Sequence, residues 1–156
     1  MGELKKITSF TVDHDYITEG VYISRVDGDI TTYDMRTRVP NAGYYMDNLT
    51  MHSFEHLFAT LVRNSAIKDN VIYFGPMGCQ TGFYLLVRDT APEAVYEVIV
   101  DILGAIASYS GEMPGNKRKE CGNFRNLSVD AASAEAKRYL EALGKAKYRF
   151  EYPKGE

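Results

Sequence analysis

The sequence predicts an α+β fold, a two-layer sandwich in which helices pack against a mainly antiparallel sheet. Three observations support this prediction. Two β-rich runs flank a glycine-containing turn near residue 28, and two more flank a glycine-rich stretch near residue 78. Three other segments carry apolar residues at helical spacing. Strands and helices in this order indicate one layered core.

Length and composition limit the possible classes of protein. The 156 residues, 45% of them hydrophobic, suit a single domain over residues 1–156. The formal net charge of -3 argues against nucleic-acid binding, and the basic run 117–119 is expected to be a solvated loop. We find neither a signal peptide nor a long apolar span, so we expect a cytoplasmic protein without a membrane partner, whose thiols stay reduced.

The N-terminal third is expected to be mostly extended. Alternating polar and apolar residues over 9–14 predict an extended, partly exposed segment. Residues 20–26 and 30–36 predict a β-hairpin, because Gly28 between them can adopt a positive φ at little cost. A loop containing Pro40 then leads to the first helix.

The first helix is expected to begin near Asn48 or Thr50, either of which can cap it, and to end near Asn64. Its core face is predicted to contain Met51, Phe54, Phe58, Leu61 and Val62. His52 and His56 lie roughly 100° or more from the centre of that face, at about 100° per residue. The two histidines are therefore not expected to be core residues.

The remaining elements follow from similar patterns. Residues 70–74 and 82–88 predict strands. Thr90-Ala91-Pro92-Glu93 predicts a capping box, with the proline in the first turn, for a second helix. A polar loop over 111–126 precedes a final helix after Ser128, and residues 145–156 are expected to add an edge strand or to fray. The second helix should bury Val95, Val98, Ile99, Ile102, Leu103 and Ile106.

The pattern His52-x-x-Glu55-His56 is the main candidate for chemistry. Residues i and i+4 share a helix face, so two imidazoles can bind one metal ion while Glu55 borders the site without being a ligand. Alone, the pattern is equally compatible with two hydrogen-bonded histidines. A catalytic metal site needs a third protein ligand, for which Cys121 is a candidate, and a His₂Cys set suits zinc, iron(II) or cobalt(II).

Cys79 is a second candidate. Its glycine-rich turn lets the backbone approach a ligand closely, and nearby cations or a metal would favour the thiolate. A semi-buried structural cysteine would fit the same pattern.

Taken together, these motifs resemble the LuxS family of S-ribosylhomocysteine lyases over most of the chain. The resemblance covers all three histidines and both cysteines. It is carried by Ser9-Phe10 with Asp13-His14, Asp34-Met35-Arg36 with Pro40-Asn41, residues 52–56, residues 75–85 and Glu120-Cys121-Gly122.

The resemblance implies a reaction: cleavage of S-ribosylhomocysteine to homocysteine and 4,5-dihydroxy-2,3-pentanedione, the precursor of the signal autoinducer-2. It implies a divalent metal, expected to be iron(II) and replaceable by zinc or cobalt. It also implies a homodimer with active sites at the subunit interface. The implied metal ligands are His52, His56 and Cys121; the acid/base groups are Cys79 and Glu55; the substrate contacts are Ser9, His14 and Arg36.

Two roles and two other classes of function remain open at this level. Arg36 could hold the homocysteine carboxylate in a bidentate pair or could form a surface salt bridge. An exposed Cys79 would be prone to oxidation. The alternatives to a lyase are a metallopeptidase of the H-x-x-E-H type, whose glutamate activates water, and a small metal-binding module. Neither alternative needs the thiol of Cys79.

Overall fold

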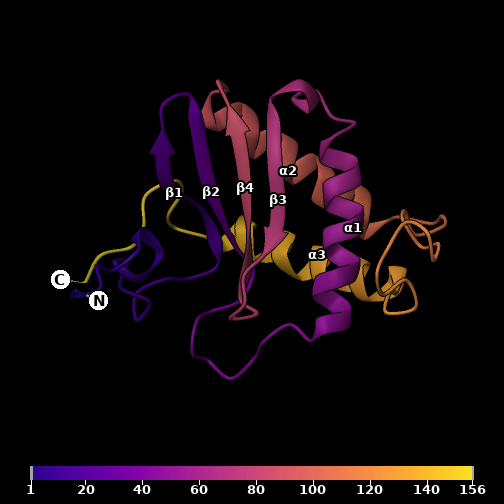
Figure 1. Cartoon of the computed structure of the whole chain (residues 1–156), viewed down its shortest axis with the longest axis horizontal. Helices are drawn as coiled ribbons and strands as arrows, with labels where there is room; N and C mark the ends of the chain where they lie inside the picture. Colours follow the sequence, from indigo (N-terminus) through magenta and orange to yellow (C-terminus); the bar gives the residue numbers. More distant parts are fainter. Residues whose placement is uncertain (1, 156) are drawn as a thin grey trace.

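Four strands form one antiparallel sheet in the computed structural model, which describes residues 2–155. Their spatial order is β1-β2-β4-β3, and each neighbouring pair is antiparallel (Figure 1). The predicted α+β fold is confirmed. The strands span Gly20–Asp27 (β1), Ile30–Arg36 (β2), Val71–Pro76 (β3) and Gly82–Arg88 (β4).

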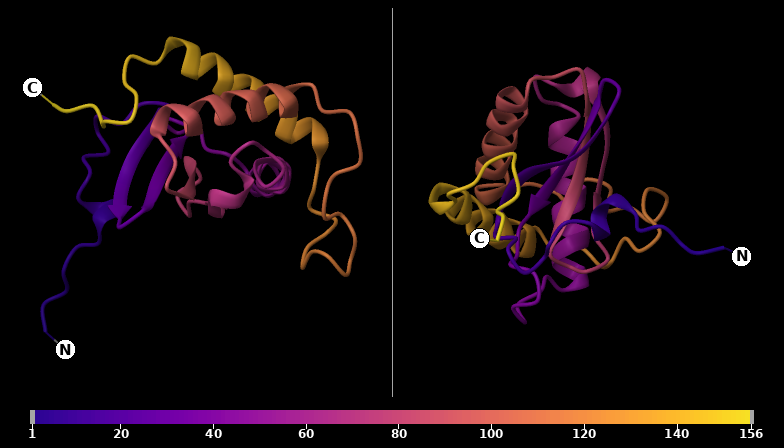
Figure 2. Two further views of the ribbon diagram at one scale, coloured as in Figure 1. Left: turned by 90° about the horizontal axis from the view of Figure 1, so that it is seen from above. Right: turned by 90° about the vertical axis from the view of Figure 1, so that its left-hand side faces the viewer.

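Three helices cover one side of this sheet. Helices α2 and α3 lie over one face, α1 lies beside β3, and the N-terminal segment runs along the opposite face (Figure 2). No helix within residues 2–155 has the length and apolar character needed to cross a membrane. The helices span Asn48–Val62 (α1), Pro92–Ala107 (α2) and Val129–Lys145 (α3), with short 3-10 helices at Thr8–Phe10 (η1) and Lys68–Asn70 (η2).

Aromatic packing fixes α1 against the sheet. Phe54 and Phe58 of α1 stack on Phe83 and Phe74, with ring centroids 4.8 Å and 4.4 Å apart. All four rings belong to the buried core. Because each such ring buries a large apolar area, the packing determines where the exposed arc of α1 points.

The two faces of β2 have different roles. Tyr33 and Met35 belong to the core beneath the helices. Since side chains alternate along a strand, Asp34 and Arg36 project from the other face, yet both are at most 3% exposed. Segments outside the sheet must therefore cover them.

Several predicted boundaries are confirmed, but the predicted N-cap of α1 is wrong. Gly28 has φ of 62° in the hairpin turn, and the final helix begins after Ser128, as predicted. Helix α1 begins at Asn48 and ends at Val62, but Asp47 is its N-cap, since its side chain accepts from the Thr50 amide at 2.7 Å. A short carboxylate satisfies a free amide of the first turn as well as Asn or Thr would.

Three other predictions are wrong in detail. Residues 8–10 form a 3-10 helix, because both the amide and the hydroxyl of Thr11 bond to the Thr8 carbonyl and no strand pairs with this segment. Ala91 is the N-cap of α2, because the Thr90 hydroxyl donates to the Arg88 carbonyl instead. The C-terminal segment, which was predicted to add an edge strand or to fray, forms one isolated β-bridge at Phe150 instead.

Candidate active site

The Nε2 atoms of His52 and His56 point toward the same site. Nδ1 of His52 lies 2.8 Å from the Asn126 carbonyl oxygen, and Nδ1 of His56 lies 2.8 Å from that of Pro114. A carbonyl can only accept, so each Nδ1 carries the proton and each Nε2 keeps a free lone pair. This arrangement, with a carbonyl orienting each imidazole, is typical of metal-binding histidines.

Cys121 completes the cluster. Its Sγ lies 3.4 Å from Nε2 of His52, and the ligand atoms of His52, His56 and Cys121 all lie within 4.8 Å of one another. The Asn123 amide donates to the same sulfur at 3.4 Å, which favours negative charge on it. Two imidazole nitrogens and one thiolate form a set that suits a divalent metal and leaves one coordination position open.

Residues of the loop 111–126 that the sequence did not single out shape this cluster. Gly115 has φ of 70°, and a Cβ atom there would lie 3.0 Å from Nδ1 of His56. At the other end of the loop, the side-chain amide of Asn126 donates to Oδ1 of Asn48, and the backbone amide of Ser128 donates to Oγ of Ser53 at 2.8 Å. The loop is therefore fixed to α1 on both sides of Cys121.

Glu55 lies beside the cluster on the same helix. It follows His52 by three residues, so the two side chains are neighbours on the helix surface. Glu55 is half-buried, and within residues 2–155 its carboxylate has no hydrogen-bond or ion-pair partner. A carboxylate without a partner is free to accept a proton.

Cys79 lies elsewhere, on the turn between β3 and β4. The exposed thiol lines a cavity of about 410 Å³ on the sheet face opposite the helices. The structure brings three other predicted residues to this cavity: Ser9, His14 and Arg36. His14 is held in place because its Nδ1 donates to the Val12 carbonyl at 2.9 Å.

Arg36 connects the thiol to a buried carboxylate. Its Nε and NH2 donate to the two carboxylate oxygens of Asp34 at 3.1 Å and 2.6 Å, while NH1 donates to Oγ1 of Thr81 at 2.9 Å. That hydroxyl lies 3.0 Å from Sγ of Cys79. Burial opposes the charge of the guanidinium, but the Asp34 carboxylate outweighs it and raises the pKa of Arg36. A surface salt bridge is therefore wrong for Arg36: its ion pair is buried.

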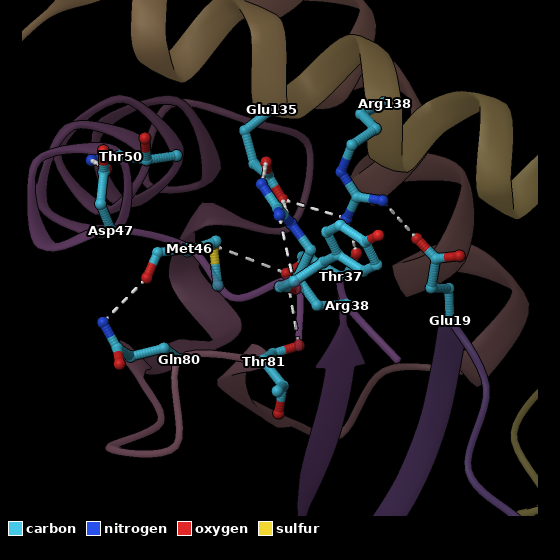
Figure 3. A network of polar contacts seen from close by, with 11 residues as sticks. Glu19, Thr37, Arg38, Met46, Asp47, Thr50, Gln80, Thr81, Glu135 and Arg138 are labelled. Atoms are coloured by element: carbon cyan, nitrogen blue, oxygen red, sulfur yellow. Dashed lines mark hydrogen bonds and ion pairs between the residues drawn. The ribbon is translucent and has the colours of Figure 1, made fainter. Parts of the chain in front are cut away.

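The turn carrying Cys79 is held by the loop that follows β2. The amides of Thr37 and Arg38 both donate to the Thr81 carbonyl at 3.0 Å (Figure 3). The Gln80 side chain donates to the Met46 carbonyl at 2.8 Å, and the Met46 amide donates to the Gln80 carbonyl at 3.1 Å. Gln80 and Thr81, the two residues after Cys79, are thus both hydrogen-bonded to this loop.

A charged network attaches this loop in turn to α3. Arg38 pairs with Glu135 at 2.6 Å, and Glu135 is 3% exposed. Arg138 contacts the same carboxylate, pairs with Glu19 at 2.7 Å and donates to the Thr37 carbonyl (Figure 3). The buried Glu135 carboxylate thus pairs with two partly exposed guanidinium groups, and this network fixes the loop after β2 against α3.

Tyr84 also borders the cavity, although no sequence pattern predicted a role for it. Burial raises its pKa, the Asp34 charge adds to this effect, and a hydrogen bond with Ser9 opposes it. Its phenol therefore stays protonated near neutral pH and can donate. The alternation within β4 could have placed it on this face, but the N-terminal segment that encloses it cannot be inferred from local pattern.

The candidate residues thus form two groups. The metal group contains His52, His56, Cys121 and the adjacent Glu55, on α1 and the loop 111–126. The second set of residues, called the thiol group from here on, contains Cys79, Ser9, His14 and Arg36 and lies on the opposite face of the sheet. Neither of the two cavities that Cys79 lines includes a member of the metal group.

Comparison with known proteins gives a consistent result. The family model of S-ribosylhomocysteinase (LuxS) matches residues 7–149. An S-ribosylhomocysteine lyase of Borreliella burgdorferi (strain ZS7) is 39% identical over 150 residues, which cover 92% of this chain and 96% of that protein. Proteins of the same description from Finegoldia magna and Desulfotalea psychrophila are 40% and 41% identical, covering 92% and 88% of this chain and 95% and 90% of their own lengths.

Proposed function

The chain belongs to the LuxS family of S-ribosylhomocysteine lyases, and we propose that it cleaves S-ribosylhomocysteine to homocysteine and 4,5-dihydroxy-2,3-pentanedione, the autoinducer-2 precursor. The observation that carries the proposal is the convergence of His52, His56 and Cys121 within a family match over residues 7–149. The family assignment leaves no support for a metallopeptidase or a non-catalytic metal module.

The triad holds a divalent cation, which we propose is iron(II) and which zinc or cobalt(II) can replace. Two imidazoles and one thiolate suit these borderline metals better than magnesium or calcium. When bound, this cation would supply a Lewis acid able to stabilise negative charge on the sugar oxygens. One such preorganised contact stabilises a transition state by on the order of 3 kcal/mol.

Cys79 and Glu55 move the protons. The ribose carbonyl must migrate from C1 to C2 and then to C3, and each migration removes a proton from carbon beside a carbonyl and returns one to the neighbouring carbon. These transfers need two groups that can change protonation state. Among residues 2–155 the Glu55 carboxylate has no hydrogen-bond or ion-pair partner. Cys79 has an exposed thiol beside a guanidinium, so both groups can alternate between acid and base.

The final step is an elimination. With the carbonyl at C3, a base removes the proton on C4, the electron pair forms the C4–C5 double bond, and the C5–S bond breaks. Sulfur leaves with its electron pair and takes up a proton, giving homocysteine. The remaining enol then gains a proton on C5 and loses its C4 hydroxyl proton, giving the dione. No water and no oxidant are consumed, because the two products together contain all the atoms of the substrate.

Ser9, His14 and Arg36 contact the substrate in this proposal. They border the cavity beside Cys79 and offer a hydroxyl, an imidazole nitrogen and a buried positive charge. Polar groups of these kinds can hold the hydroxyl and carboxylate groups of a sugar-linked amino acid.

We further propose a homodimer, because one chain separates the two groups of residues. A second copy can bring its metal group to the thiol group of the first. The sheet face around Cys79 supports this, since large apolar side chains there are exposed: Ile7 is 57%, Phe10 68% and Tyr73 54% exposed. Apolar patches of this kind mark association surfaces. Light scattering should give twice the mass of one chain, and a monomer would contradict the proposal.

The decisive test follows free thiol release from S-ribosylhomocysteine by anaerobically purified, metal-analysed protein. Wild type should release homocysteine in proportion to its metal content. Cys79→Ala should retain metal and lose turnover, whereas Cys121→Ala should lose both. Absence of thiol release from metal-loaded wild type would refute the function, and full activity in Cys79→Ala would refute the role of that thiol.

A further inference from the structure

We propose that Tyr152, in the C-terminal segment beyond α3, is a positioning residue that controls how readily Cys79 forms a thiolate, acting through Asp34 and Arg36. The inference rests on the role proposed above for Cys79. Tyr152 lies far along the sequence from the motifs that carry the family resemblance, which end at Gly122.

Continuous hydrogen bonds link the two residues. The Tyr152 hydroxyl donates to Oδ2 of Asp34 at 2.7 Å. Asp34 accepts from Arg36, Arg36 donates to Thr81, and the Thr81 hydroxyl lies 3.0 Å from Sγ of Cys79. Asp34 is 1% and Arg36 is 3% exposed, so water does not screen these charges.

The fold holds Tyr152 in this position from two sides. The Phe150 amide donates to the Val21 carbonyl and the Ile23 amide donates to the Phe150 carbonyl, both at 2.8 Å. This bridge attaches the C-terminal segment to β1. The ring of Tyr152 then stacks on that of Tyr22, with centroids 4.8 Å apart. The segment is therefore ordered up to the residue that contacts Asp34.

The phenol is suited to donate to Asp34, and the weaker effects of a hydrogen bond with Ser24 and of the Arg36 charge do not outweigh those that keep it protonated. Burial raises the pKa of Tyr152, and the adjacent Asp34 carboxylate raises it further, so the hydroxyl stays protonated throughout the working pH range. By donating to Oδ2, it shares the negative charge of Asp34 with Arg36. The guanidinium is then less completely neutralised on the side of NH1, which faces Thr81 and Cys79. More residual positive charge beside the sulfur favours the thiolate.

Removing the Tyr152 hydroxyl should therefore raise the pH at which Cys79 becomes a thiolate. In Tyr152→Phe, Asp34 concentrates its charge on Arg36, and the field at the sulfur weakens. The other titratable groups around the cavity, His14 from the N-terminal segment and Tyr84 from β4, are not changed by this substitution. Tyr148→Phe is the matched control, because Tyr148 lies in the same segment and is 48% exposed.

The experiment measures the rate at which iodoacetamide alkylates Cys79 as a function of pH, read at the Cys79 peptide by mass spectrometry on the metal-loaded protein. Tyr152→Phe should shift the half-maximal pH upward by about half a unit, a roughly threefold loss of thiolate near neutral pH. The plateau rate at high pH should stay unchanged, because exposure of the sulfur is unchanged. Turnover should fall by a similar factor with KM unaltered.

The proposal is overturned if Tyr152→Phe titrates as wild type does, if only the plateau changes, or if Tyr148→Phe shifts equally. Alkylation uses no substrate, so this result stands apart from the lyase assay. Wild-type protein without lyase activity would refute the proposed function and leave the titration interpretable.

Discussion

Gly115 lies directly against the ring of His56, so that a Cβ atom there would come within 3.0 Å of Nδ1 and 3.1 Å of Cε1. The preceding residue, Pro114, supplies the carbonyl that accepts from the same Nδ1. A backbone carbonyl and a missing side chain thus act together to orient one proposed metal ligand. The positive φ of 70° at Gly115 is the conformation that makes this approach possible.

Gly115→Ala should weaken metal binding by about 10- to 100-fold, the usual effect of disturbing a group that orients a metal ligand. Both the strained φ and the new contact push the loop away from His56. Competition with a chelator measures the affinity. Gly122→Ala is the control in the same loop, because a Cβ atom there meets nothing within 4 Å. Equal affinities in the two variants would contradict this interpretation of Gly115.

Asp47→Ala should reduce the free energy of unfolding of metal-free protein by about 1 kcal/mol at neutral pH, since it removes the N-cap of α1. Hydrogen bonds from Thr50 hold the pKa of Asp47 below its ordinary value of 3.8. Because the folded pKa is the lower one, this stabilisation is complete above pH 3.8 and is lost as the pH falls through the folded value.

Urea unfolding at several pH values and one protein concentration measures this difference. The curves of wild type and Asp47→Ala should converge in acid, while Asp47→Asn, which can still cap, should stay near wild type at neutral pH. A gap between wild type and Asp47→Ala that does not narrow below pH 3.8 would argue against a charged cap.

The proposed metal ligands on α1 could be predicted because helical periodicity is local. A spacing of four residues places His52 and His56 on one face wherever the helix lies in the fold. Cys121 was reached only as a candidate, because the loop that carries it has no regular pattern. The carbonyls of Pro114 and Asn126 could not be predicted, since backbone groups leave no signal in the sequence and the contacts span 58 and 74 residues.

The thiol group shows the same limit. Asp34 and Arg36 are two residues apart in a predicted strand, so a shared face could be inferred. Their burial could not, because it depends on the N-terminal segment and on Tyr152, 118 residues from Asp34. The N-terminal segment was itself predicted as extended, since alternation over six residues cannot distinguish an unpaired strand from a 3-10 turn.

Glu55→Gln should lower kcat by about 10²- to 10⁴-fold while metal content stays at the wild-type level. The amide keeps the size of the side chain but cannot accept a proton, and Glu55 is outside the ligand set. Metal analysis and thiol release on the same sample measure both quantities. Loss of metal would instead indicate that Glu55 is a ligand, and near-normal turnover would assign the proton transfers to other groups.

Two inactive variants should restore activity when they share a dimer. If each site combines the metal group of one subunit with the thiol group of the other, a heterodimer of His56→Ala and Cys79→Ala contains one intact site. Random assortment in co-expressed protein makes about half of the dimers mixed, so about one quarter of wild-type activity should return.

A control pair distinguishes this arrangement from a site built within one chain. His56→Ala and Glu55→Gln both alter the metal group, so their heterodimer has one changed metal group at each site and should recover nothing. Recovery by the first pair alone therefore requires that the metal and thiol groups of one site come from different subunits. No recovery by either pair, with dimers verified by light scattering, would place the whole site within a single chain and would require the segments around Cys79 and Cys121 to approach each other.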